Sequence, residues 1–423
     1  MQFSEKILNL TAKAEEALAL QFAQIERTAF ANTVRVMDAF RTHRVDEAMF
    51  NPTSGYGYND RGREALDSIW ADVMGAEAAI VRHSIVNGTQ ALTIGLFGLL
   101  RPGDILFSIA GKPYDTLDEV IGNAGTPGNG SLRDFGVEYR QADLLADGSF
   151  DREAIARTLS AEGERVKVIF IQRSKGYLNR KTLSVEQIGA LIPFLRAQAP
   201  HSYIVVDNCY GEFTETSEPT AVGADLIIGS LIKNPGGGMA ESGGYLAGSA
   251  RAVELASYRL TSVGCGTEVG ATLGQNKSLF KGLFYAPHTT AQALKTAHLA
   301  AWIFGEGLGF DVEPAWNEVR YDIIQAITTH TPEGLCAICR GIQAGSPVDS
   351  HVTPEPWAMP GYSDPVIMAA GAFTQGSSIE LSADGPLRPP YTAFLQGGLT
   401  YESGKLGIMS AADEVLRSLD RTK

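Results

Sequence analysis

The chain has 423 residues, a formal net charge of −13 at pH 7, 44% hydrophobic residues and 20% charged residues. This composition is that of a globular protein long enough for two or three domains, and it excludes disordered and fibrous classes. The acidic charge argues against nucleic acid and anionic membranes as partners, and no apolar run approaches the roughly 20 residues that span a bilayer. Four cysteines and an amphipathic N-terminal helix in place of a signal peptide predict a cytoplasmic protein.

Helices are expected over residues 1–50, because Val34, Met37 and Phe40 recur at helical spacing. From about residue 65 strands alternate with helices. Helices are expected at 88–100 and after Ser184, which forms a capping-box motif with Gln187. Strands are expected at 78–84, 104–110, 166–172, 203–208 and 224–230. Continuous Val/Ile strands that alternate with helices predict an α/β fold with a mostly parallel sheet covered on both faces.

The composition changes after about residue 290. A helical stretch there leads to PVIMAAGAF, SSIELSA and YTAFLQGG, and a last helix is expected near 403–420. This pattern predicts a smaller α+β domain at the C-terminus. We therefore expect an N-terminal helical segment (1–50), a large domain (51–285) and a small C-terminal domain (286–423).

Polar residues follow the expected strands at their carboxyl ends, where the ligands of such sheets bind. Gly88 and Thr89 open a helix directly after the first strand, and free N–H groups at a helix start form an anion site. Asp207 lies at the end of one strand, and Ser230 ends another, three residues before Lys233. No GxGxxG follows the first strand and no GxxxxGK[ST] occurs, so a nicotinamide enzyme and a P-loop NTPase lack their main motifs.

These strand-end residues are the set that pyridoxal 5′-phosphate needs. The cofactor requires a lysine amine for its Schiff base, an aspartate near the pyridine nitrogen and an anion cradle for its phosphate. Lys233 and Asp207 supply the first two, and Gly88 with Ser230 supplies the third. Asp207 would be unfavourable unpaired at the end of an apolar strand, whereas a protonated pyridine nitrogen gives it a charge-assisted hydrogen bond.

Several longer segments together carry a family resemblance. They are SGYGYNDRGRE, NGTQAL, GKPYDTLDEVIG, IQRSKGY, VVDNCYGEF, GSLIKNPGGGMAESGGYLAG and TQGSSIELSADGPLRPPY, spread over residues 54–391. The chain resembles fold type I pyridoxal-phosphate enzymes of the Cys/Met-metabolism group. It more closely resembles their methionine γ-lyase-like family of aluminium-resistance proteins, which implies a transferase-like large domain and a smaller C-terminal domain.

The resemblance implies roles for residues of the large domain. Lys233 is the Schiff-base lysine, and Asp207 pairs with the pyridine nitrogen. The backbone amides of Gly88 and Thr89, with the hydroxyl of Ser230, hold the phosphate.

Four further residues have candidate roles, three of them implied by the resemblance and one, that of Ser174, suggested by its place in the chain. Tyr114 stacks on the ring and can protonate a departing sulfur. Ser174, at a strand end, is a candidate for contact with the ring hydroxyl, with a structural loop role as an equal alternative. Tyr58 reaches the phosphate site of a neighbouring subunit, and Arg388 clamps the substrate α-carboxylate.

The chain departs from the Cys/Met pattern in two places that bear on the phosphate, and one of them is Ile232, where that group commonly has a second hydroxyl before the lysine. That group usually has Tyr-Ser-Arg where this chain has Tyr58-Asn59-Asp60. The arginine that reaches the phosphate site of the neighbouring subunit is therefore missing here or replaced by Arg61. Cys336 and Cys339 form a lone CxxC, a weak zinc signal, and we expect free thiols and no metal.

The function expected from these features is a carbon–sulfur lyase. It would act by β or γ elimination on a sulfur amino acid and give a keto acid, ammonia and a thiol. The alternatives are an aldolase or aminotransferase on the same scaffold, and a non-enzymatic relative that keeps the cofactor. The expected assembly is a homodimer with shared active sites, or a homotetramer.

Overall fold

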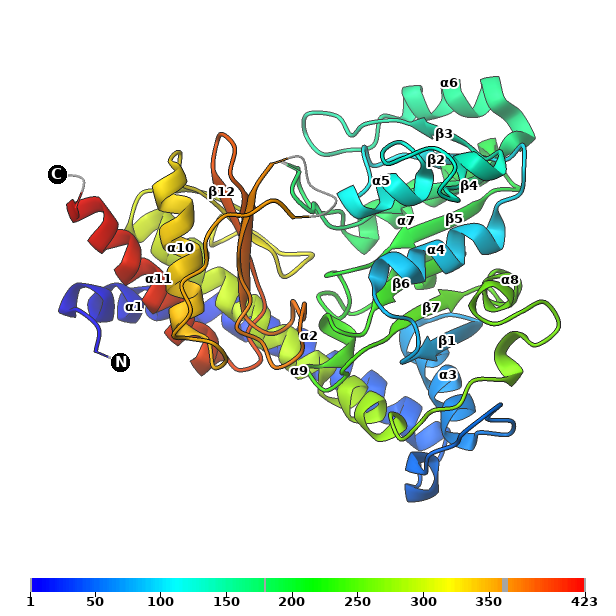
Figure 1. Cartoon of the computed structure of the whole chain (residues 1–423), viewed down its shortest axis with the longest axis horizontal. Coiled ribbons are helices and arrows are strands. Elements are labelled where there is room, and N and C mark those ends of the chain that lie inside the picture. The colour runs from blue at the N-terminus through cyan, green and yellow to red at the C-terminus, as the bar shows by residue number, and fades with distance from the viewer. Residues whose placement is uncertain (1, 179, 360–363, 422–423) are drawn as a thin grey trace. The chain divides into compact units, whose positions relative to one another are not determined.

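The structure is a computed structural model that describes residues 2–178, 180–359 and 364–421 (Figure 1). The chain forms two compact units. The larger comprises Val34–Leu231 and Met239–Phe284, and the smaller comprises Met1–Thr33, Ile232–Gly238 and Tyr285–Lys423. The division falls within two long helices, α2 (Ala19–Thr42) and α9 (Asn276–Ala301).

The larger unit is built on a seven-stranded sheet in the order β1-β7-β6-β5-β4-β2-β3. Strands β2 to β6 pair in parallel, and β7 is antiparallel to both of its neighbours. The strands are β1 (Ala78–Arg82), β2 (Ile105–Ser108), β3 (Glu138–Gln141), β4 (Val166–Gln172), β5 (Tyr203–Asp207), β6 (Leu226–Ser230) and β7 (Gly244–Gly248). The predicted mostly parallel sheet is confirmed, and all five expected strands are present. Sequence reasoning missed β3, a polar edge strand, and β7, which has a glycine at each end.

Helices cover both faces of this sheet (Figure 1). Helices α4 (Gly88–Leu99) and α8 (Ala250–Leu260) share a core with sheet residues that include Leu246 of β7. Trp70 of α3 (Arg61–Met74) packs on the neighbouring Tyr245, with ring centroids 4.8 Å apart. Since adjacent residues of a strand point to opposite faces, α3 covers the other face. Helix α4 approaches closely, because a β-carbon at Gly95 would lie 2.5 Å from Ile228 Cδ1.

The remaining helices of this unit follow the expected alternation. They are α5 (Asp115–Ile121), α6 (Arg152–Glu162) and α7 (Val185–Gln198), with short 3₁₀ turns η1 (Glu47–Phe50), η2 (Arg133–Phe135), η3 (Gly163–Arg165), η4 (Pro219–Val222) and η6 (Gly266–Glu268). Helix α7 begins with the predicted capping box, in which Ser184 and Gln187 bond each other's backbone N–H groups.

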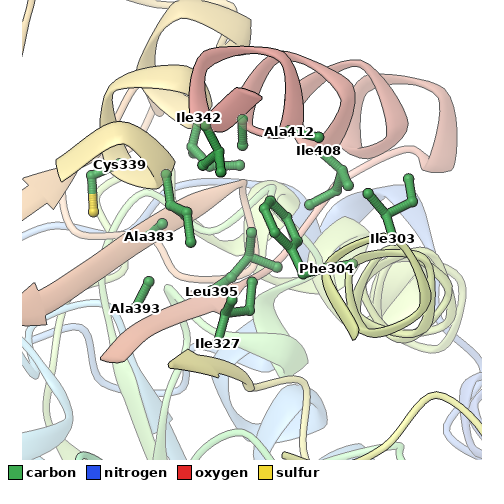
Figure 2. Packing of buried hydrophobic residues seen from close by; sticks show 14 of the residues in the cluster. Ile303, Phe304, Ile327, Cys339, Ile342, Ala383, Ala393, Leu395, Ile408 and Ala412 are labelled. Atoms are coloured by element: carbon green, nitrogen blue, oxygen red, sulfur yellow. The ribbon is translucent and has the colours of Figure 1, made fainter. Parts of the chain in front are cut away.

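The smaller unit has a five-stranded antiparallel sheet in the order β10-β11-β12-β9-β8. Its strands are β8 (Asp311–Glu313), β9 (Gln325–Thr328), β10 (Val366–Ala369), β11 (Ser382–Pro386) and β12 (Thr392–Gln396). Its other elements are α1 (Glu5–Ala17), α10 (Pro332–Gly345), α11 (Tyr401–Arg421), η5 (Asn234–Gly236) and the π-helical turn η7 (Trp302–Gly307). Figure 2 shows its core, where Leu395 of β12 lies among side chains of α10, α11 and η7. The predicted small α+β fold is therefore confirmed.

Candidate active site

The start of α4 and the end of β6 meet at one point of the larger unit. A β-carbon added at Gly88 would lie 3.4 Å from Ser230 Cβ and 3.5 Å from Cys209 Sγ. Ser230 is fully buried, and its hydroxyl has no hydrogen-bond partner in the part of the chain that the structure describes. A buried hydroxyl without a partner is unfavourable by about 1–3 kcal/mol. Such a group beside a helix start indicates a site made for a ligand that supplies the missing bond.

The first turn of α4 lies at the positive end of the helix dipole. Helix α4 is 12 residues long, and its first residues are Gly88 and Thr89. The Asn87 side chain caps the helix by accepting the Gln90 N–H at 2.8 Å. The N–H groups near the start of a helix and its dipole attract anions. The arrangement therefore suits a phosphate group.

A contact between two threonine hydroxyls joins the start of α4 to the first turn of α5, next to Tyr114. Thr89 Oγ1 lies 2.8 Å from Thr116 Oγ1, in the first turn of α5. Tyr114, two residues earlier, is the N-cap residue of α5 and is half-buried. The structure thus brings the predicted ring-stacking tyrosine close to the predicted phosphate site.

The end of β4 supports Tyr114 from the other side. Gln172 Oε1 accepts the Tyr114 backbone N–H at 2.5 Å, and Gln172 Nε2 donates to the Ser174 carbonyl at 3.0 Å. Ser174 is buried, and its hydroxyl accepts the Gly176 N–H at 3.3 Å. Sequence reasoning missed Gln172, although a polar residue that ends the apolar run VKVIFIQ was a signal for it.

Asp207 ends β5 between the strands that carry Gln172 and Ser230. It lies opposite Gln172 in the β4–β5 pairing and is 6% exposed. Its Oδ1 accepts the Cys209 N–H at 3.1 Å, and its carbonyl accepts the Arg173 N–H at 3.1 Å. A buried carboxylate on a rigid strand end is well suited to meet a cationic ring nitrogen. Six predicted residues, Gly88, Thr89, Tyr114, Ser174, Asp207 and Ser230, therefore lie at one edge of the sheet.

Lys233 follows Ser230 by three residues along the chain and belongs to the short segment Ile232–Gly238, which packs with the smaller unit. It is half-buried and is the N-cap residue of η5. Within that unit, a β-carbon at Gly238 would lie 2.3 Å from Leu399 Cδ2. Gly238 therefore packs closely in this loop, and its φ of +72° also favours glycine there.

Tyr58 lies on a separate loop of the larger unit. The residue is 59% exposed, and its ring stacks on that of Tyr56, with centroids 5.4 Å apart. The loop is held by Arg63, whose guanidinium donates to the carbonyls of Gly57 at 2.6 Å and Gly270 at 2.9 Å. Arg61, a candidate replacement for the missing arginine, donates to Asp46 at 2.9 Å. The structure therefore presents Tyr58 to the outside on a firmly anchored loop.

Arg388 lies just after β11 in the smaller unit. Its side chain is 49% exposed and forms an ion pair with Asp364 at 3.1 Å. A substrate carboxylate that bound Arg388 would compete with Asp364.

Arg173, which neighbours Ser174, and the two cysteines of the CxxC motif lie in buried surroundings. Arg173 is fully buried and donates to Asn208 Oδ1 and the Gly211 carbonyl, both at 2.9 Å, as well as to Glu215. Cys336 and Cys339 lie inside α10, and burial raises the pKa of both thiols, so they are weak nucleophiles. All four cysteines are free thiols. Within the described ranges no cluster of three or more His, Cys, Asp or Glu could hold a metal ion.

The residues present fit pyridoxal phosphate. The unpartnered Ser230 hydroxyl beside Gly88 at the start of α4 suits its phosphate, and the buried Asp207 suits its ring nitrogen. None of the helices described, over residues 2–178, 180–359 and 364–421, is long and apolar enough to cross a bilayer.

The sheet topology and the anion site define an α/β enzyme of the pyridoxal-phosphate fold type I class. The family model for methionine gamma-lyase matches residues 7–416, so the chain belongs to the methionine gamma-lyase family. It is 50% identical to the YnbB protein of Bacillus subtilis (strain 168) over 413 residues, 97% of each chain.

Solved structures give the same result. A carbon–sulfur lyase involved in aluminium resistance from Clostridium novyi NT is 47% identical, with a TM-score of 0.93 over 97% of this chain and 96% of that one. CalE6, a methionine gamma lyase from Micromonospora echinospora, shares the fold at 19% identity and a TM-score of 0.56, over 88% of this chain and 90% of that one. The family and fold class predicted from the sequence are confirmed. At the level of the family, so are the carbon–sulfur lyase class and its cofactor.

Proposed function

We propose that this protein is a pyridoxal-phosphate-dependent carbon–sulfur lyase that eliminates a thiol from a sulfur amino acid. The observation that carries the proposal is the buried, unpartnered Ser230 hydroxyl beside Gly88, at the sheet edge that also bears Asp207. Lys233 follows three residues later. The relative from Clostridium novyi, described as a carbon–sulfur lyase, supports the reaction class.

In this proposal the larger domain, residues 51–285, holds the cofactor. The amides of Gly88 and Thr89 and the hydroxyl of Ser230 bind its phosphate, and Asp207 pairs with its ring nitrogen. Lys233 attaches it covalently. Tyr114 stacks on the ring, and Ser174 contacts the ring hydroxyl.

When bound, the cofactor supplies an electron sink for negative charge at the substrate α-carbon. Asp207 keeps a positive charge on the ring favourable, because a buried carboxylate gains most from a charge-assisted hydrogen bond. The Lys233 amine takes the proton from the α-carbon. The Tyr114 hydroxyl gives a proton to the sulfur that leaves, a step of the kind that contributes about 10²–10⁴-fold. Arg388, in the smaller domain (286–423), binds the α-carboxylate.

The proposal extends to assembly and location. Tyr58 is exposed on an anchored loop, which suits a residue that completes the phosphate site of a second copy in a homodimer. Free thiols suit a reducing cytoplasm.

The test begins with the covalent link. Protein loaded with pyridoxal phosphate is reduced with borohydride and digested, and mass spectrometry should find the added mass on Lys233. Lys233→Ala should lose it, whereas Lys277→Ala, at an exposed lysine of α9, should keep it. Modification of another lysine would contradict the assignment.

The reaction class is tested with a panel of cystathionine, cysteine and methionine. We expect keto acid and thiol in equal amounts from at least one of them, and none with Lys233→Ala. Bound cofactor with no thiol from any member of the panel would instead favour an aldolase or aminotransferase. The keto acid that forms distinguishes the two reactions, because β elimination gives pyruvate and γ elimination gives 2-oxobutanoate.

A further inference from the structure

The side-chain amide of Gln172 joins two loops at the proposed cofactor site. Its oxygen accepts the Tyr114 N–H at 2.5 Å, and its nitrogen donates to the Ser174 carbonyl at 3.0 Å. Gln172 ends β4 and is 4% exposed, so the amide projects from a rigid strand. The two loops are far apart in sequence, and this side chain links them directly.

The loop after Gln172 in turn packs against the Tyr114 ring. A β-carbon at Gly176 would lie 3.1 Å from Tyr114 Cδ2, and the Tyr177 ring centroid is 5.9 Å from that of Tyr114. Gly176 also has φ +56°, a conformation that side chains disfavour. The position of the ring therefore depends on the path of residues 174–177.

Arg180 fastens the same loop from its far end. Its Nη2 donates to the carbonyls of Gln172 at 2.7 Å and Ser174 at 2.6 Å. The Ser174 carbonyl thus accepts from both Gln172 and Arg180. A glutamate at position 172 could still accept the Tyr114 N–H, but its second oxygen would face the Ser174 carbonyl without a hydrogen to donate.

We propose that Gln172 is a positioning residue that sets the place of the Tyr114 ring against the cofactor, through the Tyr114 backbone and the 174–177 loop. The inference rests on the proposed function, in which Tyr114 stacks on the ring and protonates the leaving sulfur. It assigns to Gln172 no contact with substrate. Displacements of about 1 Å at such groups reduce rates by about 10²-fold.

The first measurement uses the protein without cofactor. Gln172→Met keeps the length of the side chain and removes both bonds. Hydrogen exchange at the Tyr114 N–H, followed by mass spectrometry with fragmentation, should become about tenfold faster or more. Gln343→Met is the matched control, because Gln343 is also a buried glutamine that bridges two segments. Its side-chain oxygen accepts the Ala370 N–H and its nitrogen donates to the Asp349 carbonyl, both at 3.0 Å. It should leave exchange at Tyr114 unchanged.

The second measurement uses the loaded enzyme. Gln172→Met should lower kcat by about 10²-fold with little change in KM, and should alter the circular dichroism of the cofactor band. Gln172→Glu should show the same changes, since it restores only one of the two bonds. Gln343→Met should show neither change.

The outcomes separate this inference from the function on which it rests. Wild-type protein that binds no cofactor would overturn both, even with faster exchange at Tyr114. Wild-type activity together with an unchanged kcat and cofactor spectrum in Gln172→Met would overturn the role of Gln172 alone. Equal loss of activity in Gln343→Met would overturn it as well, because the effect would then reflect general loosening of the fold.

Discussion

A β-carbon at position 88 would touch Ser230, with the two Cβ atoms 3.4 Å apart, which is an ordinary contact distance. The protein without cofactor can therefore accept Gly88→Ala. The added methyl group would nevertheless occupy the space in which a phosphate oxygen would lie, between the α4 start and the Ser230 hydroxyl.

For Gly88→Ala we expect affinity for pyridoxal phosphate to fall by about tenfold or more, which corresponds to about 1.4 kcal/mol. Stability without cofactor should stay within about 1 kcal/mol of wild type, because alanine is at least as good a helix former as glycine. Titration with pyridoxal phosphate, followed by the absorbance of the bound cofactor, measures the affinity. Urea unfolding of the cofactor-free protein measures the stability. Unchanged affinity would remove Gly88 from the proposed phosphate site.

Ser230→Ala should stabilise the cofactor-free protein and weaken the binding of the cofactor. Since the Ser230 hydroxyl is buried without a partner, its removal should stabilise the cofactor-free protein, by up to about 1–3 kcal/mol. Cofactor affinity should fall, because a phosphate contact is lost.

The matched control for that substitution is Ser108→Ala. Ser108 is equally buried, but its hydroxyl donates to the Gly111 carbonyl at 2.6 Å, so its loss should destabilise the protein by about 1 kcal/mol. Denaturation midpoints of both variants without cofactor check the signs. Destabilisation by Ser230→Ala as large as that by Ser108→Ala would argue against a vacant bonding site at Ser230.

Tyr114→Phe separates the ring from its hydroxyl. The ring still stacks, so cofactor affinity should hold, while thiol release should slow by about 10²–10⁴-fold because the proton donor is gone. Rapid mixing with substrate and a thiol reagent measures the rate. Tyr177→Phe, at the neighbouring ring, is the control and should release thiol at the wild-type rate.

Arg388 and Asp364 give a pair of opposite predictions. Because Asp364 pairs with Arg388 at 3.1 Å, a substrate carboxylate must displace it. Arg388→Ala should raise KM by about tenfold or more, and Asp364→Asn should lower KM. Both side chains are partly exposed, so stability should change by less than about 1 kcal/mol. A raised KM in Asp364→Asn would show that the ion pair itself is needed to hold Arg388 in place.

Acid should destabilise the protein through His298. Burial and the nearby Arg320 lower the pKa of His298 from 6.5 to about 3, and its Nδ1 lies 2.7 Å from the Trp316 carbonyl. As pH falls below 6.5, His298 binds a proton in the unfolded chain but stays neutral in the folded protein. Its contribution to stability is complete above pH 6.5 and is lost towards pH 3. Between pH 7 and pH 4 the loss from this residue is about 3 kcal/mol.

The measurement is urea unfolding at several pH values. His298→Asn cannot take up the proton, so its stability should fall less between pH 7 and pH 4. His288→Asn, at an exposed histidine of the same helix, should keep the wild-type pH dependence. Identical pH profiles for wild type and His298→Asn would contradict the assignment.

The sequence by itself determined which candidate residues follow the ends of buried strands. Apolar runs that end in Asp207 and Ser230, the helix that opens at Gly88 and the placement of Lys233 are local patterns, and the carboxyl ends of parallel strands lie at one edge. The capping box at Ser184 and Gln187 is likewise a contact between near neighbours.

Only the tertiary structure decided which side chains meet across that edge. Gln172 bonds Tyr114 from 58 residues away, and the Ser230 hydroxyl is left without a partner beside Gly88. The same holds for β7, which joins β1 to β6 in the sheet, and for the pairing of Arg388 with Asp364. Contacts of this kind depend on packing between distant segments, and local periodicity carries no information about them.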